Sequence, residues 1–560
     1  MFYWFLIFVI VIVVLVVFFI YDYYNNKRSD SKILDNIKAK WGRPIDSRRN
    51  FKLIAAYLNA SDSPQKISQA TIEDLDLVNI FNYIDRTNSK PGKQYLYKKL
   101  FTPETSFEEL IKFDKKVGAV NMPKPDIEAV ELELSRLNNS DAYFLTELFL
   151  KEHVPLLAPV LAVYIRISGI AIIALLLSLI FLPNLVSCVA LAALLIANLI
   201  LHYNTRGTLS TYTRSLPQLL ILNRVARRLL KKIHFEEDEP VKLSLDNLLG
   251  LNRSLRLVSF ESKLADKPEN FRYALYKIVK LIFLLEPLMF ITSITRVNKY
   301  RSDIEHVYKY VGEIDTMVAV LSVRAGLPYY AKPVFYTGDE QMELTEMYHP
   351  LIVNCVPNSI QTRTDEGVLI TGSNMSGKTT FIRSIAVNTL LAQTIYTTCT
   401  KEYKAPVLKI QTSIKTSDNL QGQTSYFQAE AISILDIMKK SGDKEPVKSL
   451  IIIDEIFRGT NTIERIAAAK SVLTWLTDNK NFVFVSTHDL ELAELLDNEY
   501  AVYSFEESVS DTRLVFDYKM KTGILKKNNG IATLATIGYP ESVVEDAYIV
   551  SEGLKRRYLL

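Results

Sequence analysis

A short segment bounded by two glycines has the residue types and the spacing of a loop that wraps phosphate groups. Gly372 and Gly377 enclose it, and Lys378 and Thr379 follow directly. In such a loop backbone N–H groups point at phosphate oxygens, the lysine reaches the outer phosphates and the threonine hydroxyl ligates Mg²⁺. The candidate nucleotide-binding residues are therefore Gly372, Ser373, Asn374, Met375, Ser376, Gly377, Lys378, Thr379 and Thr380.

Two carboxylates and a histidine that could act on a bound phosphate follow two later apolar runs. The run 450–453 ends in Asp454 and Glu455, and the run 482–485 leads to His488. Such runs indicate strands buried in a parallel sheet, whose carboxyl ends share one edge. We expect Asp454 to hold Mg²⁺, Glu455 to activate the attacking water and His488 to sense the outer phosphate. A lone histidine is more often structural, which is the alternative for His488.

The elements around the glycine-bounded loop are those that position such a site. Residues 367–371 form an apolar run typical of a buried strand, and residues 380–393 have a helical pattern. Strand, loop and helix in this order bring the helix N-terminus, with its positive potential, to the phosphates.

Four segments in this region resemble the ATPase domain of MutS proteins. In chain order they read TGSNMSGKTTFIR, DNLQGQTSYFQAE, IIIDEIFRGTNT and STHD. The similarity extends over about 315–554, and weakly over 75–103, which looks like the start of the MutS core domain. The resemblance implies an α/β P-loop nucleoside triphosphatase, ABC- or MutS-like, preceded by an α-helical core region.

The resemblance also implies ATP and Mg²⁺ as ligands and a homodimer with composite nucleotide sites. In such a dimer Ser425 reaches the nucleotide held by the partner subunit, although from the residues alone it reads as a helix-capping or turn hydroxyl. Asn358 belongs to a Pro-Asn element near the base. Cys355 stands where the family often stacks an aromatic residue on adenine, and Tyr518 is the expected substitute.

DNA binding of the mismatch-repair kind rests on the resemblance only. MutS repair proteins carry an N-terminal domain that reads mismatches, and the residues ahead of the helical region are too few for such a domain. Their lever helices end in a clamp on the duplex, whereas the apolar block 154–203 interrupts the corresponding region here. We therefore expect no mismatch reader.

Composition excludes several classes of protein. A net charge of +4 does not fit a dedicated nucleic-acid coat, and three separated cysteines with six unclustered histidines fit neither a disulfide framework nor a zinc site. One basic stretch could meet DNA phosphates, anionic lipid or only solvent, and the acids at 236–239 favour lipid or solvent. It comprises Arg224, Arg227, Arg228, Lys231 and Lys232.

The uncharged segment 1–21 has the length of a membrane span. As a helix it would reach ~31 Å, the thickness of a bilayer's hydrocarbon core. No small-residue cleavage site follows, so we expect an uncleaved anchor over 1–24. Lys27 and Arg28 after the span place the rest of the chain in the cytoplasm.

A second apolar block, 154–203, is broken at Pro183-Asn184, which predicts two antiparallel helices. Arg166 and Arg206 put both ends of this hairpin on the cytoplasmic side. The first arm is short unless Arg166 snorkels, so a re-entrant hairpin is one alternative. A buried hairpin of a soluble protein is another.

The sequence thus predicts a multi-domain membrane protein. Its parts are a transmembrane anchor (1–24), a helical MutS-core-like region (30–150), a transmembrane hairpin (154–205), a second helical core or lever region (206–330) and a MutS-like ATPase domain (335–560). We expect a multi-pass protein of the inner, cytoplasmic membrane, with lipid and a second copy as partners and the ATPase domain in the cytoplasm. ATP would bring the two ATPase domains of the dimer together and so drive a conformational switch. The alternatives are a nucleotide-controlled scaffold or tether, and an ABC-type transport ATPase, which the lack of an LSGGQ-like signature disfavours.

Overall fold

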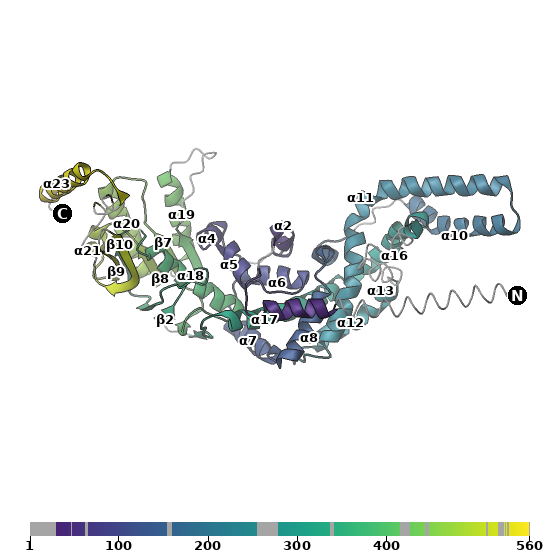
Figure 1. Cartoon of the computed structure of the whole chain (residues 1–560), viewed down its shortest axis with the longest axis horizontal. Coiled ribbons are helices and arrows are strands. Elements are labelled where there is room, and N and C mark those ends of the chain that lie inside the picture. The colour runs from purple at the N-terminus through teal and green to yellow at the C-terminus, as the bar shows by residue number, and fades with distance from the viewer. Residues whose placement is uncertain are drawn as a thin grey trace. The chain divides into compact units, whose positions relative to one another are not determined.

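The structure is a computed structural model, and its described residues form two compact units (Figure 1). The helical unit takes the described residues of 1–62, 85–98 and 115–325, and the α/β unit those of 63–84, 99–114 and 326–560. The expectations for the anchor over 1–24, for Asn374 and for Ser425 lie outside the described residues. The residues that the structure describes are 30–45, 48–61, 65–153, 159–254, 278–336, 341–373, 375–414, 426–442, 447–510, 513–524, 531, 534 and 537–558.

The helical unit contains the long helices of the chain. Its elements are α2 (Phe51–Ile54), α3 (Ala56–Asn59), α8 (Lys124–Ser135), η1 (Ser140–Thr146), α9 (Glu147–Leu150), α10 (Pro159–Phe181), α11 (Leu185–Leu229), α12 (Glu239–Asn247), α13 (Leu249–Ser254), α16 (Leu285–Lys299) and α17 (Arg301–Gly326). Two further helices, α6 (Lys90–Phe101) and α7 (Phe107–Val120), have residues in both units. The helical region expected ahead of the α/β domain is confirmed.

The helical unit buries a cluster of carboxylates where the segment 85–93 meets α17. Asp315 accepts hydrogen bonds from the backbone N–H groups of Asn88 at 2.9 Å and Ser89 at 2.7 Å. The amide of Asn88 donates to Glu131 at 3.1 Å. Burial raises the pKa of Asp315 to about 6 and that of Glu131 to about 7, because a buried charge loses its hydration.

Helices α10 and α11 form a hairpin (Figure 1). It buries some of its polar side chains and exposes many of its apolar ones. Asn198 and Ser168 are 0% and 2% exposed, whereas Ile170 and Ile180 are 70% and 71% exposed. Residues 160–181 and 185–205 are each long and apolar enough to cross a membrane. This arrangement is the reverse of a helical hairpin in water, which hides its apolar side chains.

The buried polar groups of the hairpin bond to one another and to the helical segment ahead of α16. The hydroxyl of Tyr164 donates to the Asn198 amide oxygen at 2.8 Å, and the Asn198 amide donates to the carbonyl of Ile282 at 2.8 Å. At the turn, Asn184 caps α11 by accepting from the N–H of Ser187 at 2.7 Å. Helix α11 then continues through Pro217 to Leu229, well past the end of the apolar block.

The α/β unit is built on a six-stranded sheet in the order β10-β9-β4-β8-β7-β6. The strands are β4 (Gly367–Gly372), β6 (Lys409–Ser413), β7 (Ser449–Asp454), β8 (Phe482–Ser486), β9 (Tyr500–Ser510) and β10 (Arg513–Thr522). All neighbours run parallel except β9 and β10. Every residue of β4 and β8 is buried, because helices cover a parallel sheet on both faces. The α/β character predicted for this part of the chain is confirmed, and the sheet is parallel except for its antiparallel edge strand β10.

A second, four-stranded sheet and several helices complete the α/β unit. Its strands are β1 (Val334–Phe335), β2 (Gln341–Met347), β3 (Asn358–Arg363) and β5 (Glu402–Ala405), in the order β1-β5-β2-β3. The helices are α4 (Gln69–Asp74), α5 (Leu77–Ile84), α18 (Lys378–Ile395), α19 (Tyr426–Lys440), α20 (Thr462–Asp478), α21 (Leu490–Leu495) and α23 (Glu541–Tyr558). Helix α4 docks on β6 through Asp74, which accepts from the Thr412 hydroxyl at 2.7 Å and the Ile414 N–H at 3.0 Å.

Candidate nucleotide site

The carboxyl ends of three neighbouring parallel strands meet at one edge of the large sheet. Ile370 of β4 and Asp454 of β7 are both in register with Ser486 of β8. The glycine-bounded loop leaves β4 at this edge, and Glu455 and His488 follow β7 and β8. The side chains singled out in the sequence are therefore brought together by strand register.

Two glycines let the backbone turn from β4 into α18. Gly372 has φ +144°, and a Cβ there would lie 2.6 Å from the carbonyl oxygen of Phe505. Gly377 has φ +110° and precedes the first residue of α18. A side chain at either position would be strained, because L residues rarely adopt such φ values. The loop thus keeps its close approach to β9 and presents the N-terminus of α18.

Lys378 and Thr379 begin α18 and point at the strand ends. The ammonium group of Lys378 donates to the carbonyls of Gly372 at 2.7 Å and Ser373 at 2.8 Å. Burial lowers the pKa of Lys378 to about 8, although the acids Glu455, Asp454 and Glu507 oppose this shift. The lysine therefore lies folded over the loop, at the position where phosphates would replace the two carbonyls as its partners.

Asp454 is held between two hydroxyl groups. The hydroxyl of Thr379 donates to Asp454 Oδ2 at 2.9 Å, and that of Ser486 donates to Oδ1. A hydroxyl and a carboxylate side by side are oxygen donors of the kind that bind Mg²⁺, which usually takes one or two protein ligands beside phosphate and water. Thr379 and Asp454 could therefore hold this ion together.

Both oxygens of Glu455 have cationic or hydrogen-bonding partners. His488 Nε2 lies 2.9 Å from Oε1, and Arg458 Nε lies 2.8 Å from Oε2. Burial alone would raise the pKa of Glu455, but the bond to His488 and the charges of His488, Arg458 and Lys378 outweigh it and lower the pKa. Glu455 is thus kept ionised, as a proton acceptor requires. His488 also lies 3.4 Å from the Lys378 ammonium.

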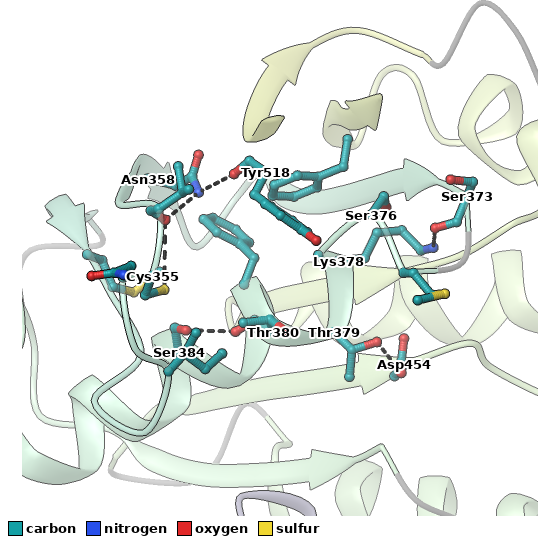
Figure 2. Close-up of a pocket in the computed structure, with 18 of the residues that line it drawn as sticks. Cys355, Asn358, Ser373, Ser376, Lys378, Thr379, Thr380, Ser384, Asp454 and Tyr518 are labelled. Carbon is teal, nitrogen blue, oxygen red and sulfur yellow. Dashed lines mark hydrogen bonds between the residues drawn. The ribbon is translucent and has the colours of Figure 1, made fainter. Parts of the chain in front are cut away.

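A cavity of about 550 Å³ extends from these residues to Cys355, Asn358 and Tyr518. Figure 2 shows Cys355 and Asn358 at one end, Ser373 at the other, and Lys378 and Tyr518 between them. The predicted site residues that line the cavity are Asn358, Ser373, Met375, Ser376, Gly377, Lys378, Thr379, Thr380, Asp454, Glu455 and Tyr518. Gly372 and His488 adjoin it through their contacts with Lys378.

The end of the cavity near Asn358 is tied to the last strand of the large sheet. The Asn358 amide donates to the carbonyl of Tyr518 at 3.0 Å and accepts from the N–H of Met520 at 2.9 Å. Tyr518 stacks on Phe516 with ring centroids 5.9 Å apart, and Cys355 lines the same cavity. An aromatic face and a backbone-fixed amide could hold a flat base here.

Sequence reasoning missed two charged residues of this region. Arg458 forms an ion pair with Glu455 at 2.8 Å and also lies 3.8 Å from Asp454. Glu507, on β9, accepts a hydrogen bond from the Ser373 hydroxyl at 2.5 Å. Arg458 stands in the segment IFRGTNT, so its proximity to the acids could have been suspected. Nothing near Glu507 in the sequence indicates its place at the loop.

The geometry defines a class: a multi-domain protein with a helical region and a mixed α/β domain that carries a candidate nucleotide site. Comparison with protein families refines this class. Residues 368–555 match the model of the family MutS domain V. The MutS resemblance of the carboxyl-terminal part of the chain is therefore confirmed.

Individual relatives are similar over the carboxyl-terminal half of the chain. The DNA mismatch repair protein MutS of Clostridium botulinum (strain Loch Maree / Type A3) is 32% identical over 251 residues, which are 42% of this chain and 26% of the relative. The DNA mismatch repair protein MutS of Thermus thermophilus is 29% identical over 293 residues, 50% of this chain and 34% of the relative. The chain thus spans about a quarter to a third of the length of these relatives.

Proposed function

We propose that the chain is a membrane-bound ATPase that binds and hydrolyses ATP with Mg²⁺ in the cavity of the α/β unit. One observation carries the proposal: Lys378, Asp454 and Glu455 converge on one cavity at the carboxyl edge of a parallel sheet. This edge is where open α/β sheets bind their ligands. The MutS domain V match over the same residues supports it.

The residues divide the chemistry among themselves. Lys378 and the N-terminus of α18 bind phosphate oxygens, and Thr379 with Asp454 holds Mg²⁺, which neutralises charge on the phosphates. Glu455, oriented by His488 at 2.9 Å, accepts the proton of the attacking water. Asn358 and Tyr518 hold the base at the far end of the cavity.

A second copy of the chain is the proposed partner of the α/β unit. The resemblance to MutS implies composite sites in which Ser425 reaches the nucleotide of the other subunit. Helix α23 exposes apolar side chains that would be covered in a dimer: Val543 is 46%, Ile549 71% and Val550 51% exposed. In a dimer of this kind, ATP would bring the two α/β units together and move the helical units.

Lipid is the proposed surrounding of the α10–α11 hairpin. Its inward residues Tyr164 and Asn198 are hydrogen-bonded, and its outward residues are mostly apolar, with Arg166 as the exposed charge, an arrangement that suits an apolar medium. The two apolar helices have the length of membrane spans. Arg166, in the second turn of α10, and Arg206, just past the second span, support a cytoplasmic side for the hairpin ends and the ATPase.

The basic stretch after the hairpin does not support a polyanion contact. Arg228 pairs with Glu133 at 2.8 Å, and Arg227 lies 3.4 Å from Asp246. These ion pairs favour the solvated-face interpretation of the stretch. A DNA role therefore rests on the relatives' names, and ATPase rates with homoduplex, mismatched and branched DNA beside lipid-only controls would test it.

The test of the ATPase proposal uses the full chain in detergent. Lys378→Ala should weaken nucleotide binding more than a hundredfold, because it removes the cation that binds the outer phosphates; binding and phosphate release are both measured. Lys401→Ala is the matched control, since Lys401 pairs with Glu346 at an exposed place in the same unit. Unchanged binding and hydrolysis in Lys378→Ala would overturn the proposal. Slow turnover with nucleotide-dependent dimerisation by light scattering would favour a scaffold or tether instead.

A further inference from the structure

Strand β9 carries an acidic residue to the phosphate end of the cavity. The strand runs parallel to β4 until Gly372, which is in register with Phe505. Two residues beyond Phe505, the carboxylate of Glu507 accepts a hydrogen bond from the Ser373 hydroxyl at 2.5 Å. An acid is thus attached to the second residue of the glycine-bounded loop.

This acid lies behind Ser373, which lines the end of the cavity where the last phosphate would bind. The carbonyl of Ser373 accepts from the Lys378 ammonium at 2.8 Å, and a lysine in this position reaches the outer phosphates. Figure 2 places Ser373 at the end opposite Cys355 and Asn358, where the base would lie. The carboxylate of Glu507 is also close enough to Lys378 for the two charges to interact.

From this geometry we propose that Glu507 is a specificity-determining residue that weakens the binding of a nucleoside triphosphate relative to the diphosphate. The inference rests on the proposed nucleotide site and adds a property of it. A triphosphate brings one more phosphate group than a diphosphate to the end beside Ser373. Like charges repel, and they do so more strongly where protein displaces water.

The effect is moderate, because Ser373 stands between Glu507 and the ligand and water reaches part of both residues. Glu507 and Ser373 are each half-buried. Repulsion between charges several ångströms apart at a partly exposed place corresponds to a change of about three- to tenfold in affinity. Glu507 therefore sets the ratio of the two affinities and leaves the site able to bind both nucleotides.

A neighbouring acid provides a matched control. Glu506 precedes Glu507 on β9, so its side chain points to the opposite face of the strand. There it pairs with Lys521 of β10 at 3.0 Å. Glu506→Gln removes the same charge from the same strand without touching the loop.

The experiment measures the dissociation constants of ADP and of a non-hydrolysable ATP analogue, with Mg²⁺, by calorimetry on the full chain in detergent. In Glu507→Gln the constant for the analogue should fall about three- to tenfold and that for ADP less than twofold. The glutamine amide can still bond to Ser373, so the loop keeps its anchor. Ser373→Ala, which frees the carboxylate to move away, should give a smaller change in the same direction. Glu506→Gln should change both constants less than twofold.

The outcomes separate this inference from the function on which it rests. If the unmodified chain binds neither nucleotide, the proposed ATPase site itself fails. The inference is wrong if the chain binds both nucleotides and Glu507→Gln leaves the ratio of the two dissociation constants unchanged, or raises the constant for the analogue. Glu507 would then only hold the loop in place. A ratio that changes equally in Glu506→Gln would show a general effect of net charge and would also overturn it.

Discussion

The sheet edge of the α/β unit and the α10–α11 hairpin place their polar side chains in opposite ways. In the sheet, Ile453 is 1% exposed while Arg458, just past the strand end, lies open to the cavity. In the hairpin, Asn198 is 0% exposed while Ile180 is 71% exposed. Each arrangement suits a different surrounding, water for the first and hydrocarbon for the second.

The comparison relates the exposure of the side chains in each region to the medium proposed for it. Polar groups that gather at a strand edge can exchange water for a ligand, as Lys378 can exchange two carbonyls for phosphates. Polar groups inside the hairpin would have no water to exchange in the proposed membrane, and Tyr164 and Asn198 are bonded to one another. Substitutions at the sheet edge should therefore change nucleotide binding or hydrolysis, and a charge on the outer face of the hairpin should change its insertion into the membrane.

The largest expected effect is at the sheet edge. Glu455→Gln removes the proposed proton acceptor but keeps its size, so kcat should fall about 10²- to 10⁴-fold while ATP stays bound. Steady-state phosphate release and nucleotide retention on the purified chain measure both. Glu494→Gln, an exposed acid on α21, is the control and should keep full activity. If Glu455→Gln hydrolyses ATP at the normal rate, Glu455 is not the proton acceptor.

The second effect tests the medium around the hairpin. Ile170→Arg puts a charge on the exposed face near the middle of α10, which should cost about 3 kcal/mol in a membrane and less than about 0.5 kcal/mol in water. Leu243→Arg on α12, a residue 64% exposed, is the matched substitution outside the hairpin. Protection of the hairpin from protease in lipid vesicles measures both, because the anchor expected over 1–24 would keep either variant in the membrane fraction.

The result for Leu243→Arg decides how the first variant is interpreted. We expect the hairpin of Leu243→Arg to be protected like that of the unmodified chain and the hairpin of Ile170→Arg to lose protection. If both variants are protected alike, the outer face of the hairpin does not lie in lipid, and the comparison between the two regions fails.

Much of the candidate site could be predicted because its signals are local. A glycine-bounded loop between a strand and a helix is a continuous pattern, and so is an apolar run that ends in Asp454 and Glu455. The turn at Pro183-Asn184 is equally local, and the two helices do separate there. Partners distant in sequence could not be predicted, because no pattern near Glu507 or Asp74 points to Ser373 or Thr412.

The third effect concerns acids that the helical unit buries. Glu131 has its pKa raised by burial to about 7 from an ordinary 4.5. The folded state therefore holds the proton more tightly than the unfolded state, and stability falls as the pH rises from about 4.5 to 7. Glu131→Gln cannot ionise, and its amide oxygen can still accept from Asn88. It should stabilise the unit by about 3 kcal/mol at about pH 8 and change little at about pH 4.5.

Thermal unfolding at the two pH values measures this difference. Glu239→Gln, at an exposed position of α12, should not change the pH dependence. Asp315, whose pKa burial raises to about 6, remains in the variant and leaves part of the slope. A variant at Glu131 that is destabilised equally at both pH values would mean that the carboxylate is needed as an ion.

The smallest effect compares one helix cap in each region. Asn184 accepts from the N–H of Ser187 at 2.7 Å, and Asn461 accepts from the N–H of Glu464 at 3.0 Å. Replacing Asn461 by alanine should cost about 1 kcal/mol, because water can take over the freed N–H. Asn184→Ala should cost more, since the tip of the hairpin, in the proposed membrane, would offer that N–H fewer waters. Hydrogen exchange at Ser187 and Glu464 reports each cap, and serine at either position should restore it. Equal acceleration at the two amides would place the tip of the hairpin in ordinary water.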